Sequence, residues 1–186
     1  MGAGALRDLM RTGHAIDPAA LCDLEFGGIS LGLPRFVERL TWKTFQKVFH
    51  RDPQTGALRG WNVRLEQRGI DADSVALQHR GQRVTFGHYQ VVPLDVAQPP
   101  RPCGPGLMID YGRGGNSRWD PMRCVRDPLV AVHSGSVDLL LGWSYVDLGF
   151  VRLSTPSYFL LQRERPLSHR VAPPHRPALP LPSSTH

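Results

Sequence analysis

Charged and polar side chains gather around the pair Gly114-Gly115, between two apolar stretches of the chain. They are Asp110, Arg113, Asn116, Asp120, Arg123 and Asp127. A glycine backbone can approach an anion closely, and arginine pairs with carboxylate or phosphate groups. No Gly-Lys-Ser/Thr sequence follows, so the stretch lacks the spacing of a phosphate-binding loop. We favour a network of Asp–Arg pairs that orders the turn, and ligand contact through Arg113, Asn116 or Arg123 is the alternative.

Other side chains that could carry chemistry show no recognisable arrangement. His88 falls in a predicted strand but has no neighbour at the spacing of a metal ligand. The cysteines are odd in number and form no CxxC pair, which argues against a disulfide framework and against a zinc site. They are Cys22, Cys103 and Cys124. Ser144 and Ser157 lack the context of a nucleophile elbow. The sequence therefore predicts no metal, no cofactor and no identifiable catalytic residue.

Four apolar runs have the length of strands rather than helices, and the polar stretch lies between the first two. They are residues 107–111, 129–133, 139–148 and 158–161. We interpret them as consecutive antiparallel strands. Upstream, Trp61, Val63 and Leu65 alternate with polar residues, which predicts a strand in a sheet with one wet face.

Further segments complete the predicted sheet. Residues 25–32 combine apolar residues with glycines, as a strand with a bulge does. Residues 75–79 and 83–92 predict a hairpin, and the proline-rich residues 98–105 predict a loop. Seven or eight strands with short connections indicate a mainly β protein, a small meandering antiparallel barrel with one helix that caps an end.

The capping helix is expected between residues 34 and 48. Apolar side chains there recur at helical spacing behind a proline that suits the first turn. They include Phe36, Val37, Leu40, Phe45 and Val48. The competing interpretation makes residues 42–50 a strand paired with the alternating segment. We favour the helix, because a strand would place Lys43 and Lys47 on the same face as Phe45 and Phe49.

Length and composition predict one globular domain. The chain has 186 residues, of which 41% are hydrophobic and 20% charged, enough for a real core. We assign residues 1–164 to this domain, including a loose helical arm over residues 1–23 in which Asp17-Pro18 begins a short turn. Residues 165–186 are rich in proline and polar residues, which predicts a disordered tail.

Charge and hydropathy exclude several partners. No run of 18 apolar residues and no signal segment is present, so we expect no membrane span and a cytoplasmic location. The net charge is +6, but the basic residues are interspersed with acidic ones and form no aromatic-lined cluster. We therefore expect no nucleic-acid binding. The sequence carries no signal for an oligomeric state.

Several short motifs carry a resemblance. They are Thr12-Gly13-His14, Met108-x-Asp110, Arg126-Asp127, Leu141-Gly142 and the segment that begins Ser157-Tyr158-Phe159. Together they resemble uncharacterised bacterial proteins that begin with a GXWXG domain, mainly over the last third of the chain. This chain has no GXWXG sequence, and Phe26-Gly27-Gly28-Ile29 stands in its place. The resemblance implies a small calycin-like barrel and brings no catalytic residue.

Two functions from different classes follow. In the first, the barrel binds a hydrophobic or amphipathic small molecule, with the 36–48 helix as lid. Trp143 and Tyr145, which share a face, would line the cavity, and Arg113 or Arg123 would meet a polar head. In the second, the protein is a hydrolase or isomerase of lipid-like substrates, with Asp110 or His88 as general base in the same cavity. The lack of a recognisable nucleophile favours binding. The candidate ligand-binding residues are Arg113, Asn116, Arg123, Trp143, Tyr145, His88 and Asp110.

Overall fold

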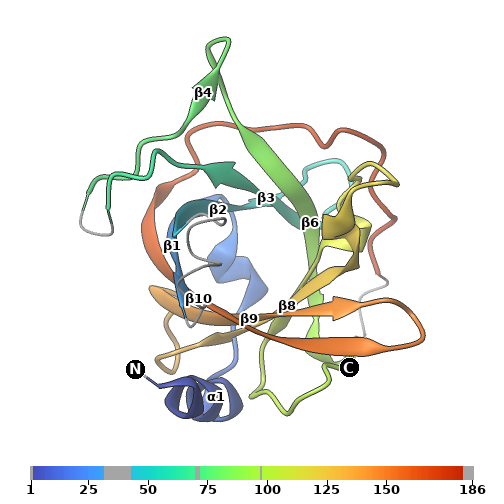
Figure 1. Cartoon of the computed structure of the whole chain (residues 1–186). Helices are drawn as coiled ribbons and strands as arrows, with labels where there is room; N and C mark the ends of the chain where they lie inside the picture. The colour runs from blue at the N-terminus through green and yellow to red at the C-terminus, as the bar shows by residue number, and fades with distance from the viewer. Residues whose placement is uncertain (1, 32–42, 70–71, 97, 182–186) are drawn as a thin grey trace.

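A closed antiparallel barrel of eight strands forms the body of the protein. The computed structural model describes residues 2–31, 43–69, 72–96 and 98–181 (Figure 1). The strands follow the order β1-β10-β9-β8-β7-β6-β3-β2 around the ring. They are β1 (Leu24–Leu31), β2 (Thr44–Arg51), β3 (Leu58–Arg64), β6 (Thr85–Pro93), β7 (Leu107–Asp110), β8 (Val125–Ala131), β9 (Leu139–Asp147) and β10 (Arg152–Pro166). The predicted mainly β barrel is confirmed.

The remaining elements are short and lie outside the sheet or at its ends. A small hairpin projects from the barrel, with a two-residue turn in which Arg80 and Gly81 both have positive φ. Its strands are β4 (Gln78–His79) and β5 (Gln82–Arg83). The helices are α1 (Ala3–Thr12) and the short 3-10 turns η1 (Pro18–Leu21), η2 (Leu94–Val96), η3 (Tyr111–Arg113) and η4 (Pro121–Cys124). No described helix has the length and apolar character needed to cross a bilayer.

The segment after α1 closes one end of the barrel. Figure 1 looks into the ring of strands, and the blue turn η1 lies inside it. Asp17 accepts a hydrogen bond from the backbone N–H of Ala19 and Pro18 follows it, as the sequence predicts for a helix start. Ile16 and Leu21 pack with the interior side chains of the barrel. This end is therefore filled by apolar residues.

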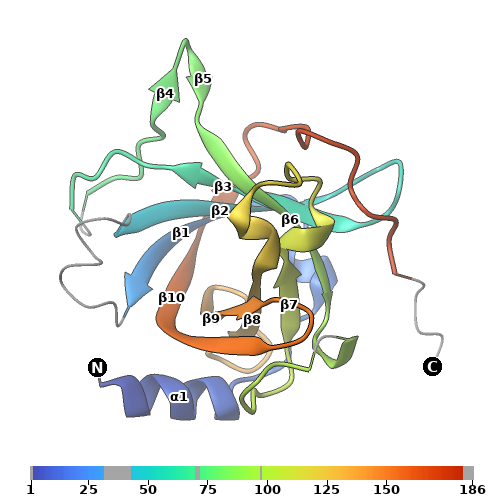
Figure 2. The same cartoon turned by 45° about the vertical axis from the view of Figure 1, so that its right-hand side comes forward.

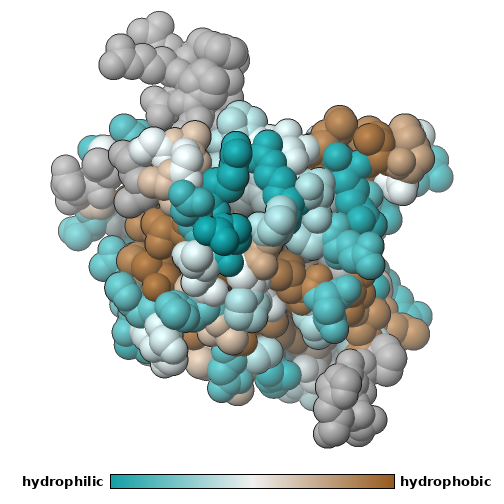
Figure 3. Space-filling model, turned by 90° about the horizontal axis from the view of Figure 1, so that it is seen from below, coloured by the Kyte–Doolittle hydropathy of each residue, from teal (hydrophilic) through white to brown (hydrophobic). Residues whose placement is uncertain are grey.

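Apolar side chains lie on both faces of the barrel wall. The interior cluster includes Phe26, Phe49, Leu129 and Leu161. A second cluster lies outside, where α1 packs across β9 through Leu6 and Met10 (Figure 2). Figure 3 shows the face below the barrel, where hydrophobic side chains form separate groups with hydrophilic ones between them. Both faces of the wall are thus covered in places.

The prediction of a helix over residues 34–48 is wrong in its last part. Residues 44–48 belong to β2, which pairs antiparallel with both β1 and β3. The predicted helical residues 34–42 lie outside the described part of the chain. The strand interpretation holds because Lys47, which counted against it, does share the inner face with Phe45 and Phe49. Polar partners inside the barrel compensate for this lysine.

The alternation of β3 is as predicted, but its apolar face points outward. Trp61 and Val63 form a third cluster with Val48 on the outside of the wall. Leu167 and Val171, which follow β10, pack over that cluster. Asn62, expected on the wet face, therefore points into the barrel and is buried. The alternation of apolar and polar residues in β3 shows that the two faces of the strand differ. Which face points into the barrel depends on the segments that cover the outside of the wall.

The chain beyond β10 follows the outside of the barrel, as the red segment in Figures 1 and 2 shows. The N–H groups of Leu167, His175 and Ala178 donate hydrogen bonds to carbonyls of the body. Buried Glu25 accepts bonds from the N–H and hydroxyl of Ser168, at 2.9 and 2.6 Å. Where the sequence predicts disorder for residues 165–186, the described part of this segment thus makes specific contacts.

Candidate functional site

A lysine lies in the interior of the barrel. Strand β2 places Phe45, Lys47 and Phe49 on its inner face and Val48 on its outer face. The side chain of Lys47 is only 2% exposed. Burying an ammonium group costs several kcal/mol unless charged and polar partners surround it. The partners of Lys47 therefore define the polar part of the interior.

Four polar side chains from four strands or their ends form one network. Lys47 Nζ donates to Asn62 Oδ1 at 2.9 Å and to the Tyr111 hydroxyl at 2.7 Å. Tyr111 donates to Asp127 Oδ2 at 2.9 Å, and Nζ lies 3.6 Å from the same oxygen. The Tyr111 hydroxyl thus stands between the lysine and the carboxylate. A proton on Nζ has a direct hydrogen-bonded path to Asp127.

Aromatic rings enclose the ammonium group. Nζ lies 5.0 Å from the ring centroid of Tyr89, 5.2 Å from those of Tyr111 and Phe159, and 5.7 Å from that of Phe45. Ring faces attract a cation at such distances, more strongly where water is excluded. The rings therefore hold the amine in place while keeping its surroundings apolar.

Burial dominates the titration of this network. It lowers the pKa of Lys47 to about 8, although the charge of Asp127 acts in the opposite direction. Burial also raises the pKa of Asp127, and Lys47 opposes this only in part. It raises the pKa of Tyr111 well above its ordinary value, so the phenol keeps its proton. The amine can thus lose its charge near neutral pH, and Tyr111 can relay a proton without ionising.

The carboxylate of Asp127 retains acceptor capacity. The Ser144 hydroxyl faces it and acts with Lys47 to lower the pKa of Asp127. Even so, Oδ1 is buried and has no hydrogen-bond partner among the described residues. Unpartnered buried polar atoms are uncommon in native structures, because such atoms normally bond to protein or to ordered water. Oδ1 is therefore available to a molecule inside the barrel.

The network faces a cavity of about 230 Å³. Its walls combine the polar network with aromatic and apolar side chains. The lining residues are Ser30, Phe45, Lys47, Asn62, Phe86, Tyr111, Met122, Asp127, Ser144, Ser157 and Phe159. Phe45, Phe86 and Met122 are half-buried, whereas Lys47 and Asp127 are buried. The charged groups therefore lie at the bottom of the cavity and the apolar side chains nearer its mouth.

Two glycines make room for the site. Gly142 pairs with Phe159 across β9 and β10, and a Cβ at Gly142 would lie 2.1 Å from the Phe159 ring. Gly87 has φ +53°, and a Cβ there would lie 2.9 Å from Asn62 Nδ2. That Nδ2 donates to the Gly87 carbonyl at 3.1 Å, which orients the amide oxygen toward Lys47. Both positions thus require the smallest residue because the site packs directly against the backbone.

Two of the predicted cavity residues lie outside the barrel. Trp143 and Tyr145 share a face, as expected, but it is the outer face of β9, in the cluster that α1 covers. Trp143 donates through Nε1 to the carbonyl of Thr155 at 2.8 Å. The inner face of the same strand carries Gly142 and Ser144. These aromatics therefore support the wall and do not line the interior cavity.

The two predicted general bases also lie outside the cavity. His88 packs beside Trp61 on the outer face, and burial together with the charge of Arg59 lowers the pKa of His88 to about 4. Asp110 accepts from the N–H of Gly112 and pairs with Arg126 at 3.1 Å. Burial raises the pKa of Asp110, while Arg126 opposes the shift. Neither group reaches the interior network.

The remaining predicted site residues order the chain around η3 and η4. Buried Asn116 holds the backbone of His88 through both its N–H and its carbonyl. Arg113 donates to Gln90 and to the carbonyl of Leu179 in the segment after β10. Arg123 lines a separate groove beside that segment. The polar insert thus forms structural contacts, and the structure does not bring these three residues together with the cavity.

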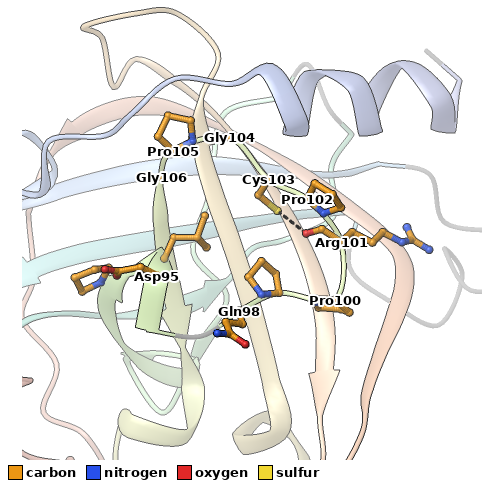
Figure 4. Close-up of a pocket in the computed structure, with 12 residues that line it drawn as sticks. Asp95, Gln98, Pro100, Arg101, Pro102, Cys103, Gly104, Pro105 and Gly106 are labelled. Carbon is orange, nitrogen blue, oxygen red and sulfur yellow. Dashed lines mark hydrogen bonds between the residues drawn. The ribbon is translucent and has the colours of Figure 1, made fainter.

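Another pocket lies in the loop between β6 and β7 (Figure 4). It has a volume of about 770 Å³ and is built chiefly of prolines, glycines and backbone. Figure 4 shows Arg101 extending away from Asp95 and Gln98, and the Arg101 guanidinium lies 5.2 Å from the Trp143 ring. Burial raises the pKa of the nearby Cys103 thiol to about 11. This pocket holds few groups that could recognise a ligand.

Comparisons with known proteins do not assign the chain to a family. No family model matches the chain, and neither does any curated protein or solved structure. Among the described residues, no group of three or more His, Cys, Asp or Glu side chains could hold a metal ion. The chemistry of the interior cavity therefore rests on the geometry of its own side chains.

Proposed function

We propose that this protein binds a small amphipathic molecule in the cavity of its barrel. The apolar part of the ligand would lie against Phe45, Phe86 and Met122 near the mouth, and its polar head would meet Lys47 and Asp127 at the bottom. The proposal takes the barrel to be calycin-like, with an interior that holds one small ligand. The half-buried rim gives the ligand a way in.

The buried Lys47–Asp127 pair beside a cavity is the observation that carries this proposal. Replacing a buried ion pair by well-packed apolar residues is often neutral or stabilising, so stability alone does not require such a pair. A cavity lowers stability in proportion to its volume. Apolar side chains that filled it would therefore stabilise the fold further. Both charges line the cavity, and Asp127 Oδ1 has no hydrogen-bond partner among the described residues, which supports a binding role for this pair.

Charge and size restrict the ligand. The opposite charges of Lys47 and Asp127 cancel, so an ionised head group would add an uncompensated charge to a buried site. A neutral carbonyl, amide or hydroxyl head can accept from Nζ and donate to Oδ1. The cavity of about 230 Å³ is below the ~300 Å³ at the lower end of ordinary ligand pockets. The ligand is therefore a single ring or short chain rather than a long acyl chain.

Native mass spectrometry of the protein purified from its own host tests the proposal directly. A bound small molecule should appear as a discrete mass above that of the polypeptide. In parallel, saturation-transfer NMR with benzamide tests recognition of an aromatic ring with a neutral head. The amide offers both an acceptor for Lys47 and a donor for Asp127.

A cavity-filling variant supplies the specificity control. Ser144→Leu places an apolar side chain in the cavity and should abolish the benzamide signal while the barrel stays folded. Ser154→Leu makes the same change at an exposed position of β10 and should leave the signal intact. Equal signals from both variants would show that benzamide binds elsewhere and would overturn the proposal.

A further inference from the structure

We infer that Lys47 is a nucleophilic amine that captures small aldehydes or ketones in the barrel as a Schiff base. This inference rests on the proposed function, since it uses the same cavity and names the chemical class of the ligand. It goes further because it makes binding covalent and reversible. Two features of the site support it: the enclosure of the amine and the proton path from the amine to Asp127.

The enclosure of the amine favours its neutral, nucleophilic form. Nζ donates to Asn62 and Tyr111, lies beside the carboxylate of Asp127, and is surrounded by aromatic rings. Lysines are activated as nucleophiles when they are desolvated in an apolar pocket. The carboxylate that would keep the amine charged lies 3.6 Å away, with the Tyr111 hydroxyl bridging the two groups. The pKa of Lys47, which burial lowers to about 8, agrees with this geometry.

The proton path accounts for both steps of the reaction. An Nζ proton passes to the Tyr111 oxygen while the Tyr111 proton passes to Asp127 Oδ2, leaving a neutral amine and a protonated carboxyl group. The nitrogen lone pair then forms a bond to the carbonyl carbon, and the electrons of the C=O π bond move to oxygen. After a proton moves from nitrogen to that oxygen, a carbinolamine results.

Loss of water completes the capture. Asp127 returns its proton to the carbinolamine hydroxyl, the C–O bond breaks, and the nitrogen lone pair forms the C=N bond. The net change is that one carbonyl compound and one amine give one imine and one water molecule. The protonated imine carries the charge that Lys47 carried before, and Asp127 remains its counterion. No oxidant, reductant or metal enters this balance.

The composition of the chain makes the inference unusually easy to test. Of 22 basic Lys and Arg residues, only Lys43 and Lys47 are lysines. Lys43 is exposed just before β2, whereas Lys47 is buried within it. Arginine does not form a Schiff base under these conditions because its guanidinium stays protonated. The chain therefore contains one candidate lysine and one matched control.

Reductive trapping is the experiment. The full chain is incubated with benzaldehyde and sodium cyanoborohydride, and the product is analysed by intact mass and peptide mapping. We expect one benzyl group, attached at Lys47, in the wild-type protein. Below a pH of about 8, the trapping rate should rise roughly tenfold per pH unit, because the neutral fraction of Lys47 limits it, and it should level off above. The trapping rate at an ordinary exposed lysine, with a pKa of ~10.4, would keep rising with pH through this range.

Matched variants separate site from background. Lys47→Arg should lower trapping roughly tenfold or more, since it removes the nucleophile, and Lys43→Arg should leave it unchanged. The position of the adduct in the wild-type chain decides the question even where Lys47→Arg fails to fold. Adducts found only at Lys43 or at the N-terminal amine would overturn the inference.

The benzamide measurement separates failure of this inference from failure of the proposed function. Benzamide resembles benzaldehyde in shape but forms no imine. Benzamide binding without trapping at Lys47 would leave the binding function standing and overturn covalent capture. Absence of both would overturn both. Trapping at Lys47 that benzamide suppresses in competition is the result expected if both are correct.

Discussion

The amine of Lys47 and the carboxylate of Asp127 face each other in the barrel interior, with Nζ 3.6 Å from Oδ2. Their side chains are only 2% and 4% exposed, so water contributes little to screening their charges. Each residue therefore depends on the other. This mutual dependence governs how the protein should respond to substitution and to pH.

Removing one member of the pair should be costly. We expect Asp127→Asn to lower the free energy of unfolding by about 3–5 kcal/mol, because it leaves the Lys47 charge buried without its counterion. The double variant Lys47→Met/Asp127→Leu should recover much of the loss. Urea unfolding measures both. As a control, Asp138→Asn breaks the exposed pair with Arg163 and should cost less than about 1 kcal/mol. If the loss of unfolding free energy in the double variant equals the sum of the losses from the two single changes, Lys47 and Asp127 are not coupled.

Stability should increase with pH in the range where Lys47 titrates. The pKa of Lys47 is about 8 in the folded protein, and that of an unfolded lysine is ~10.4. Between these values the unfolded chain binds a proton that the folded chain lacks, so the free energy of unfolding rises with pH. Asp127, whose folded pKa is raised, acts in the opposite sense at low pH.

The comparison to make is wild type against Lys47→Met between pH ~8 and ~9.5. The unfolding free energy of the wild type, minus that of Lys47→Met, should increase as the pH rises. Over the full titration of Lys47 the increase should be a few kcal/mol at most. Tyr89 and Tyr111 stay protonated in the fold at higher pH, but both proteins contain them, so their contribution cancels in this difference. Parallel pH profiles for the two proteins would show that Lys47 titrates normally.

Trp143→Ala should weaken the fold without touching the cavity. The ring is 1% exposed in the outer cluster beneath α1, so its removal should cost about 3–5 kcal/mol. The affinity of the remaining folded protein for benzamide should not change. Thermal unfolding and ligand NMR on one sample measure both quantities. Loss of binding from fully folded protein would place Trp143 in the binding site after all.

Truncation after Pro166 tests whether the final segment docks. Buried Glu25 would lose both bonds from Ser168, and the Trp61 cluster would lose Leu167 and Val171. Burial raises the pKa of Glu25, but its bonds from Ser168 and Arg165 outweigh this and hold the pKa below its ordinary value. We expect a loss of about 1–3 kcal/mol from the unpaired acceptor alone.

A point variant gives the same test without shortening the chain. Ser168→Ala should reproduce part of the loss, whereas His169→Ala, at an exposed neighbouring position, should not. The hydrogen bonds to Glu25 favour its ionised form. The loss of unfolding free energy caused by Ser168→Ala should therefore become smaller as the pH falls below ~4.3, the ordinary pKa of glutamate. A truncated protein with unchanged stability would instead support the disorder that the sequence predicts.

The sequence predicts the barrel because most of its strands, though not β2, carry a local signal. Strands β7, β9 and β10 appear as apolar runs, and β3 appears as strict alternation. The sequence does not reveal which face is inside, since that depends on α1 and the final segment covering the outer wall. For this reason Trp143, which the sequence predicts to line the cavity, lies on the outer face, as does Trp61.

The site was missed for a related reason. Lys47 alternates with Phe45 and Phe49, and a lysine on an apolar face counts against a strand unless partners elsewhere in the chain compensate it. Those partners, Asn62 and Asp127, come from other strands and share no sequence pattern with it. The one available signal was the misfit itself, because a charged residue on an inward face marks either an error or a site.

The barrel is closed by pairing its first strand with its last, from Leu24 opposite Pro166 to Leu31 opposite Tyr158. Contacts so distant in sequence give a fold a high contact order and slow its formation. During synthesis, β1 has one bare edge until the ribosome has released Pro166, and the interior stays open to water until then. Fragments that end before β10 should therefore expose a strand edge that can pair with other chains.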